Sequence, residues 1–413
     1  MSIEFNMIAV ILLPMVVALV ISFLSTPIVK SFACKLGAID VPKDERRMHK
    51  VPIPRMGGLA IFLGFIISVL LFVEIDDQMK GILLGSVIIV VMGIIDDITP
   101  LRASLKFVVQ ILAALIPIYY GVQITCITNP NLLSDNPYWN FGWLSVPITV
   151  IWIVGLTNAV NLIDGLDGLA IGVSSISALT MLAIAILVAE PQVAVIMAAL
   201  VGACIGFMPY NMNPAKIFMG DTGSTFLGYI LACITIQGLF KFYAVISFVV
   251  PFLILGLPIF DTMFAIIRRI SHGQNPMAPD RSHVHHRLID MGLNQKQAVA
   301  VLYVISAILG LSAVVLATSG EIKAILCLMA LIIVCLIAVR VIFLPHMSDE
   351  EKKHWKEHSL RQELSEIEEE VREEVAANRE PPSGTQPAED EEAAEASAGE
   401  GPETDGNANG ERT

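Results

Sequence analysis

Long apolar runs alternate with short polar segments along this chain. An α-helix needs about 20 mostly apolar residues to cross a bilayer, so the runs predict about eleven membrane-spanning helices. We place them at residues 7–28, 57–74, 80–95, 104–122, 145–162, 169–189, 192–209, 222–240, 243–267, 297–318 and 322–344. The expected fold is an all-α integral membrane protein. The run at 80–95 is short and is the least clearly defined helix.

The distribution of Lys and Arg predicts the orientation. The first apolar run follows an acidic residue and precedes Lys30, the reverse of a cleavable signal, so we expect it to remain as a helix. Fifteen Lys and Arg residues lie on the side of the loop after this helix, against three on the opposite side. Positive loops are cytoplasmic, which places the N-terminus outside and the C-terminus in the cytoplasm.

Composition excludes a soluble domain, because 55% of the 413 residues are hydrophobic and the mean hydropathy is +0.70. The net charge of −13 belongs to the tail. Residues 349–413 hold 21 acidic and 7 basic residues, whereas the preceding 348 hold 18 and 19. We therefore expect a transmembrane domain at 1–345, a charged cytoplasmic helical segment at 346–378 and an acidic disordered tail at 379–413. The six cysteines show no metal spacing and no disulfide framework.

The polar stretch Asn158-Ala-Val-Asn-Leu-Ile-Asp-Gly-Leu-Asp-Gly-Leu-Ala170 joins two apolar runs. Polar groups at a membrane edge are costly unless they have partners, so they predict a functional site. Asp164 and Asp167 are three residues apart, and one helical turn would place both on one face. A simple polar turn between two helices is the alternative. Similar clusters elsewhere in the chain argue against it.

Two of these clusters lie in the N-terminal third, on the predicted cytoplasmic side. Residues 48–58 form a basic loop that ends in two glycines as a helix begins, an arrangement suited to phosphate. Ordinary positive loop charge explains this loop equally well. Asp96 and Asp97 are adjacent and are followed by Arg102 and Lys106. A helix cap would explain one of these aspartates but not both.

Two more clusters follow on the same side. Residues 211–224 contain Asp221, which could cap the next helix or bind magnesium, a metal that takes one or two carboxylates together with substrate phosphates. The loop 268–296 contains Pro279-Asp-Arg-Ser-His-Val-His-His-Arg287. Its histidines could bind a transition metal, but Arg281 and Arg287 and the lack of cysteine favour an anion.

These motifs resemble those of the polyprenyl-phosphate N-acetylhexosamine-1-phosphate transferases, in the family's order from about Lys30 to Leu344. The histidine segment is similar to the WecA/TagO branch, which uses UDP-N-acetylglucosamine. The MraY branch has three consecutive histidines, whereas Val284 follows the first histidine here. An MraY-type phospho-MurNAc-pentapeptide transferase is therefore the alternative within the family.

The resemblance implies transfer of N-acetylglucosamine 1-phosphate from UDP-GlcNAc to undecaprenyl phosphate with release of UMP. It implies a Mg2+ cofactor, with Mn2+ as the alternative metal, a bacterial inner-membrane location and no nucleic-acid partner. A homodimer is left open. Specificity for the sugar is expected to come from the loop 268–296, because every UDP-sugar would satisfy the metal and uridine contacts equally.

The resemblance also implies a role for each matched residue. The metal would be held by Asp221, Asp164 and Asn161. The acceptor phosphate would be deprotonated by Asp96, with Asp97 beside it and with Asp164 counted among the catalytic carboxylates. The remaining residues would bind substrate: Asp167, Asn211 and Phe218 toward the nucleoside, Arg281, His283, His285 and His286 toward the pyrophosphate or sugar, and Lys106 with His49 or Lys50 toward phosphates. Asn158 is expected to bind substrate as well.

A secondary transporter is the alternative from another class. Transporters place ionisable groups near the bilayer midplane, on broken helices related by internal repeats. In this chain the apolar runs carry charge almost only near their predicted cytoplasmic ends, and no repeat is visible. Asp261, shortly after Gly256-Leu-Pro258, is the nearest exception. The pattern therefore favours the enzyme.

Overall fold

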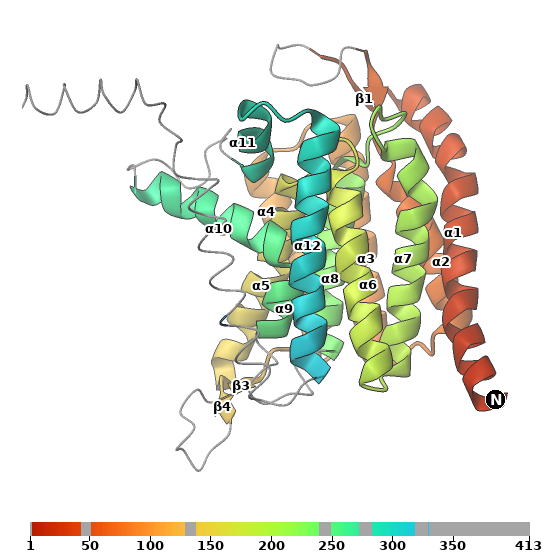
Figure 1. Cartoon of the computed structure of the whole chain (residues 1–413), viewed down its shortest axis with the longest axis vertical. Helices are drawn as coiled ribbons and strands as arrows, with labels where there is room; N and C mark the ends of the chain where they lie inside the picture. The colour runs from red at the N-terminus through yellow and green to blue at the C-terminus, as the bar shows by residue number, and fades with distance from the viewer. Residues whose placement is uncertain are drawn as a thin grey trace, which may run out of the picture. The chain divides into compact units, whose positions relative to one another are not determined.

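The structure is a computed structural model that describes residues 2–42, 51–128, 138–238, 249–271 and 283–318, together with Met329. It is nearly all helical (Figure 1). The helices are α1 (Ser2–Leu36), α2 (Gly58–Phe72), α3 (Asp77–Ile98), α4 (Ala103–Tyr119), α5 (Ser145–Leu162), α6 (Leu169–Leu187), α7 (Pro191–Asn211), α8 (Gly220–Gly238), α9 (Val249–Ile254), α10 (Gly256–Ser271), α11 (Val284–Asp290) and α12 (Gln295–Thr318).

Two short antiparallel ladders accompany the helices, a small departure from the all-α expectation. β1 (Ile39–Asp40) pairs with β2 (Ile53–Pro54), and β3 (Cys126–Thr128) pairs with β4 (Tyr138–Asn140). A 3-10 turn, η1 (Gly142–Leu144), precedes α5. The two ladders lie at opposite ends of the helices in Figure 1.

The described helices confirm a multi-pass membrane protein. Six of them are long and apolar enough to cross a bilayer, and α2 and α4 are shorter apolar helices. The short run at 80–95 proves to be α3, a helix of 22 residues whose first turn is capped by Asp76. The span predicted at 322–344 and the whole tail lie outside the described residues.

The single helix predicted over 243–267 is wrong, because the structure has two helices there, α9 and α10. α10 runs away from the bundle at a steep angle in Figure 1. Pro258 lacks the N–H that would bond the carbonyl of Ile254, four residues earlier. That carbonyl instead accepts a hydrogen bond from Ser177 Oγ on α6, at 2.8 Å. A neighbouring helix thus satisfies the backbone group that the break releases.

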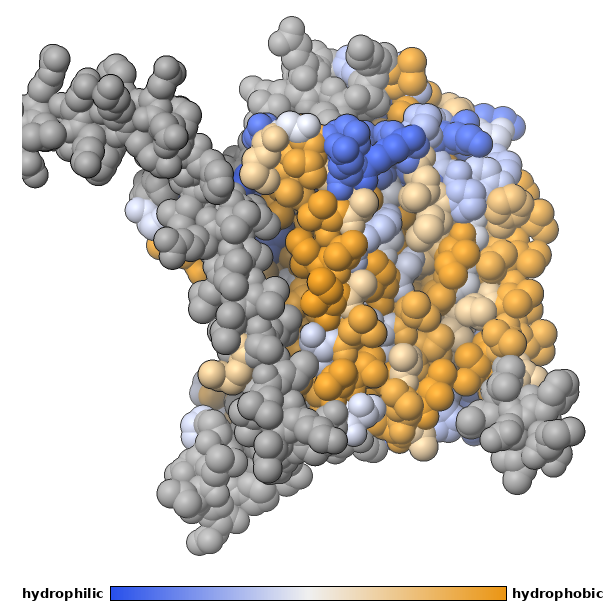
Figure 2. Space-filling view, viewed as in Figure 1, coloured by the Kyte–Doolittle hydropathy of each residue, from blue (hydrophilic) through white to orange (hydrophobic). Residues whose placement is uncertain are grey.

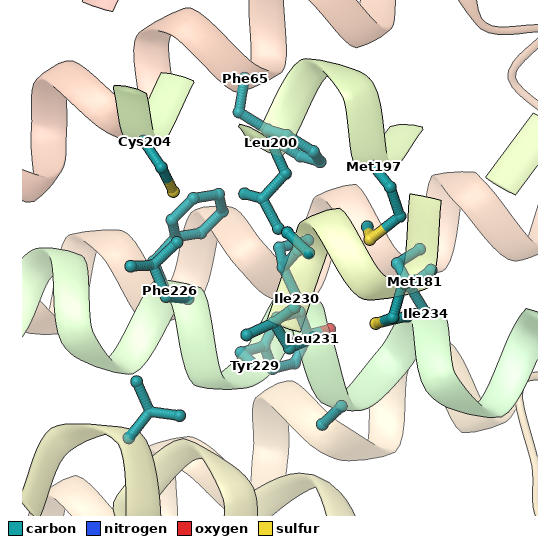
Figure 3. Close-up of a cluster of buried hydrophobic side chains, with 14 of the residues drawn as sticks. Phe65, Met181, Met197, Leu200, Cys204, Phe226, Tyr229, Ile230, Leu231 and Ile234 are labelled. Carbon is teal, nitrogen blue, oxygen red and sulfur yellow. The ribbon is translucent and has the colours of Figure 1, made fainter. Parts of the chain in front are cut away.

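The central helix of the bundle is α8, which is buried from Thr222 to Gly238. Side chains from α2, α6 and α7 surround it in Figure 3. Phe65 and Leu200 lie near Phe226 and Ile230 of α8, and Met181 lies beside Ile234. In a membrane such contacts stabilise through close van der Waals packing, so small residues at the contacts matter. This packing fixes where the first turn of α8 lies.

The start of α2 is held directly against the start of α8. The N–H groups of Gly57 and Gly58 donate to the carbonyls of Phe218 and Met219, both at 2.9 Å. A Cβ atom on Gly58 would lie 2.0 Å from the nitrogen of Gly223, so only glycine permits this approach. The polar segment before α2 is thereby placed beside the polar segment before α8.

Polar residues gather at one end of the molecule, where α11 and the β1–β2 ladder lie, and hydrophobic residues cover the helices below them (Figure 2). This end is where α3, α5 and α7 finish and where α4, α6 and α8 begin. The predicted polar clusters therefore converge there, because each of them flanks a helix end.

Candidate active site

A cavity of about 500 Å³ opens at the polar end of the bundle. It is lined by four segments and by the start of α12, and these five parts of the chain are separated from one another in the sequence. Its lining residues are Asp40, Val51, Ile53, Arg55, Asn161, Asp164, Gly165, Leu166, Asp167, Asn211, Asn213, Pro214, Ala215, Phe218, Gly220, Asp221, His286 and Gln295. Four of the five predicted clusters thus contribute side chains to one cavity, and only the Asp96–Asp97 pair does not.

Asp97 caps the first turn of α8. Its carboxylate accepts hydrogen bonds from the backbone N–H of Asp221 at 2.9 Å, the N–H of Thr222 at 3.1 Å and the Thr222 hydroxyl at 2.6 Å. Gly220 precedes this turn with φ of +71°, and a Cβ there would lie 2.4 Å from Asp97 Oδ2. Asp97 therefore positions Asp221 and does not itself line the cavity.

Lys106 of α4 binds both Asp96 and Asp221. Its Nζ donates to Asp96 Oδ2 at 3.0 Å and to Asp221 Oδ2 at 2.6 Å. The second oxygen of Asp96 accepts from the N–H of Leu101 at 2.8 Å. Charge-assisted bonds of this kind are short and strong, so Lys106 holds α3, α4 and α8 together beside the cavity.

Arg55 is a site residue that the sequence analysis did not single out. It lines the cavity, and its Nε lies 3.8 Å from Asp97 Oδ1. The signal was present in the sequence, since Arg55 stands just before the two glycines that open α2. Its guanidinium supplies positive charge to the cavity lining.

Asp164 and Asn161 enter the cavity from the end of α5 and the loop after it. Asn161 Nδ2 donates to Ser224 Oγ on α8 at 2.8 Å. No described residue donates a hydrogen bond to the Asp164 carboxylate. Burial, together with the charges of Asp221 and Asp97, raises the pKa of Asp164 to about 7. A cation in the cavity would reverse that shift.

Asp167 and Asn211 tie the α5–α6 loop to the α7–α8 loop. Asp167 Oδ2 accepts from Asn213 Nδ2 and from the N–H of Ala215, both at 3.0 Å. Asn211 Oδ1 accepts from the N–H of Gly168 at 3.2 Å, and its Nδ2 donates to the Ile217 carbonyl at 3.1 Å. Both ends of the Asn211 amide thus bind backbone groups, whereas no described residue donates to Asp167 Oδ1.

The histidine cluster lies at the start of α11. His283 Nδ1 is 2.9 Å from Asp261 Oδ2, and Asp261 Oδ1 accepts from the N–H of Val284 at 2.8 Å. The rings of His283 and His285 stack, and His285 also packs against His286. Burial and the neighbouring His286 lower the pKa of His285 to about 4, so it is neutral at pH 7. Only His286 of the three lines the cavity.

One residue of the central motif lies elsewhere. Asn158 does not line the cavity; its Nδ2 donates to Gln110 Oε1 of α4 at 2.6 Å and to the Val154 carbonyl at 2.8 Å. It therefore joins α4 to α5 one turn below the site. His49, Lys50 and Arg281 lie outside the described residues. Phe218 is in the lining, as expected for a nucleoside contact.

The residues present fit a magnesium ion. Among the described residues, no three His, Cys, Asp or Glu side chains form a metal site by themselves. Magnesium does not require three, because it commonly takes one or two carboxylates and completes its shell with waters and phosphates. Asp164 and Asp221 both line the cavity, and the Asp164 carboxylate receives no hydrogen bond there. Its oxygens are hard anionic donors of the type that magnesium prefers.

The fold and this cavity define a multi-pass membrane protein with a polar, carboxylate-rich site at one end of its helices. A family model described as "Glycosyl transferase family 4" matches residues 79–239, which contain the Asp96–Asp97, Asn158–Ala170 and Asn211–Ser224 segments. Two similar proteins extend the match well beyond those residues.

The first is a "Probable undecaprenyl-phosphate N-acetylglucosaminyl 1-phosphate transferase" of Bacillus subtilis (strain 168), 45% identical over 73% of this chain and 84% of the relative. The second is a "Decaprenyl-phosphate N-acetylglucosaminephosphotransferase" of Mycobacterium tuberculosis (strain ATCC 25618 / H37Rv), 34% identical over 69% and 77%. A "Phospho-N-acetylmuramoyl-pentapeptide-transferase" of Caldicellulosiruptor bescii is 37% identical over a shorter 52% of this chain and 71% of the relative. The chain belongs to glycosyl transferase family 4, in its polyprenyl-phosphate N-acetylglucosamine-1-phosphate transferase (WecA/TagO-like) branch.

Proposed function

We propose that this protein transfers N-acetylglucosamine 1-phosphate from UDP-GlcNAc to undecaprenyl phosphate and releases UMP. The observation that carries the proposal is the meeting of Asp164, Asp167 and Asp221 in one cavity, with Lys106 bound to Asp221 at 2.6 Å. Phosphoryl transfer depends mainly on positioning and charge neutralisation, and this arrangement supplies both. The family membership supports the same reaction.

Each side chain has a role in that reaction. Asp164 and Asp221 would hold magnesium against the donor pyrophosphate, with Asn161 beside them, and the ion when bound would neutralise developing negative charge. Lys106 and Arg55 would steady phosphate oxygens. Neutral His285 would support His286 as a hydrogen-bonding group toward the pyrophosphate or sugar.

The proposed base, Asp96, has a limited task. A phosphate monoester has a second pKa near 6, so most of the acceptor phosphate is already doubly charged at pH 7. Asp96 can take the remaining proton from the acceptor. Its larger contribution is to orient Lys106, to which it binds at 3.0 Å.

The finer topology is also proposed. About eleven helical segments would cross the membrane, with the broken pair α9 and α10 counted as one crossing. The N-terminus would lie outside and the cavity on the cytoplasmic face, where the Lys and Arg residues gather. The β3–β4 ladder with Trp139 lies at the end opposite α11 in Figure 1, and exposed Trp143 follows it, as an outer aromatic belt would require. The nucleotide sugar would thus enter from the cytoplasm while the acceptor tail stays in lipid.

The test is an assay of the purified full chain with undecaprenyl phosphate, magnesium and a panel of UDP-sugars. We expect UMP release and lipid product with UDP-GlcNAc, and neither with UDP-glucose or UDP-MurNAc-pentapeptide. UDP-glucose turnover at a comparable rate would contradict the sugar assignment. If the folded protein turned over none of these donors, the proposed reaction would be contradicted and the transporter alternative would be favoured.

A further inference from the structure

The helix α12 contributes one side chain to the cavity, Gln295, which is its first residue. Gln295 lies in the predicted loop 268–296 but outside its histidine segment 279–287, and no role was predicted for it from the sequence. It lines the cavity together with Asp167 and Asn213, and these three residues come from three segments far apart in the sequence. Their hydrogen bonds determine which groups face a ligand.

The three side chains form a chain of hydrogen bonds. Asn213 Nδ2 donates to Asp167 Oδ2 at 3.0 Å and to Gln295 Oε1 at 2.8 Å. An ionised carboxylate only accepts, so Asn213 must turn its amino group toward Asp167. Because the same amino group meets Gln295, the glutamine must present its carbonyl oxygen there. The orientation of both amides therefore follows from the charge on Asp167.

This arrangement of hydrogen bonds leaves two groups without a described partner, and both could bind a ligand. Asp167 Oδ1 remains an acceptor and Gln295 Nε2 remains a donor, and no described residue bonds to either of them. A second contact braces the pair, because the hydroxyl of Tyr303, also on α12, donates to the carbonyl of Gly168, next to Asp167. The acceptor and the donor are thus held together from both loops and from α12.

We infer that Gln295 is a residue that selects the nucleobase of the donor, with its Nε2 donating to the O4 carbonyl of uracil while Asp167 Oδ1 accepts from the adjacent N3–H. The inference rests on the proposed function, which supplies a uridine nucleotide to this cavity. Uracil presents a carbonyl and an N–H side by side on one edge. That edge matches a neighbouring donor and acceptor.

Cytosine and the acetamido group of the sugar do not match this donor and acceptor. Cytosine presents a ring nitrogen that accepts where uracil has the N–H, and an amino group that donates where uracil has a carbonyl. It would meet Asp167 with a lone pair and Gln295 with a second donor. The acetamido group of the sugar is a trans amide whose N–H and carbonyl point in opposite directions, so it cannot satisfy both at once. A site built from paired polar groups rejects such mismatches well.

The test compares inhibition of transfer by UMP and by CMP, using the full chain with UDP-GlcNAc as donor at pH 8. Gln295→Glu keeps an oxygen for Asn213 Nδ2 but replaces the Nε2 donor with an acceptor. We expect the preference for UMP over CMP to fall by roughly tenfold or more, since one favourable hydrogen bond is lost and a repulsive contact replaces it. Gln295→Leu removes the Nε2 donor, together with the Oε1 that accepts from Asn213, and adds no repulsive contact, so it should lower the preference by roughly fivefold.

The matched control is Gln297→Glu, which adds the same charge two residues further along the same turn. Gln297 is exposed, and its Oε1 accepts from the N–H of Asn294 at 3.0 Å, a bond that glutamate can also make. The preference of the Gln297→Glu variant for UMP over CMP should equal that of the wild type. The ratio of the two inhibition constants also cancels any common effect of charge on the phosphate.

Unchanged UMP preference in both Gln295 variants, with melting temperatures near the wild type, would overturn the inference. A change in the UDP-GlcNAc to UDP-glucose ratio with an unchanged UMP preference would also overturn it and assign Gln295 to the sugar. A wild-type protein that neither transfers the sugar phosphate nor responds to UMP would contradict the proposed function instead.

Discussion

The two ends of α3 each carry a pair of adjacent aspartates, and the two pairs behave differently. At its start, Asp76 Oδ1 accepts from the N–H of Met79 at 2.7 Å, and Asp77 pairs with Lys80 at 2.8 Å. These partners lie three residues away on the same helix. The Asp77 and Lys80 side chains are 77% and 51% exposed, so the pair is an ordinary surface feature.

At the end of α3, Asp96 and Asp97 reach other helices. Asp97 binds the start of α8, 124 and 125 residues further along the chain, and its side chain is fully buried. Asp96 binds Lys106, which also binds Asp221. A buried carboxylate needs such partners, whereas an exposed one needs none. The comparison shows that burial and long-range partners, and not the Asp-Asp pair itself, distinguish a site from a helix cap.

The largest effect is expected at Asp221, the carboxylate that the Asp97 cap positions. Asp221→Asn should lower transfer by about 100-fold or more, because the metal loses a charged ligand. The exposed Asp77→Asn should leave the rate within about twofold. Rates in detergent with saturating magnesium test both. Near-normal turnover of Asp221→Asn would remove the metal assignment.

The two lysines that pair with these aspartates give the next comparison. Lys106→Met should reduce the rate by roughly 10- to 100-fold, since it removes the cation shared by Asp96 and Asp221. Lys80→Met should have no measurable effect on rate or melting temperature. Equal effects of the two substitutions would show that Lys106 is only a structural pair.

A third comparison concerns pH. The pKa of Asp164 is raised to about 7, so this carboxyl holds its proton below pH 7 and loses it above. Metal requires the deprotonated form, and the apparent magnesium affinity should therefore fall by about tenfold from pH 8 to pH 6. Magnesium titrations of transfer at both pH values test this expectation. In Asp164→Asn the affinity should be weak at both, and a retained pH dependence there would assign it to another group.

The smallest effects are on stability. Asp97→Asn should lower the free energy of unfolding by about 2 kcal/mol, because charge-assisted bonds to the first turn of α8 are weakened. Asp76→Ala should cost about 1 kcal/mol, the usual value for loss of a helix cap. Thermal melts in detergent give the order of the two. A larger loss for Asp76→Ala would contradict the ranking by burial.

Properties of single segments could be predicted from the sequence. Hydrophobic run length is a local quantity, and it located α2 through α8 and α12 to within a few residues. The grouping of polar motifs at one end also followed, because alternate helix ends of an up-and-down bundle must meet on the same side. Where a local chemical constraint was overlooked, the prediction failed: Pro258 separates α9 from α10 inside an apolar run that looks continuous.

The tertiary structure decided which polar side chains bond to one another. Asn158 and Asn161 belong to one motif, yet Asn158 binds Gln110 of α4 away from the cavity, whereas Asn161 lines the cavity and binds Ser224 of α8. Gln295 lies outside the histidine segment of its loop and still accepts a hydrogen bond from Asn213. A hydrogen bond between distant segments requires two helices to be packed at one height and rotation, and that geometry is set by side-chain packing around α8 rather than by any short stretch of sequence.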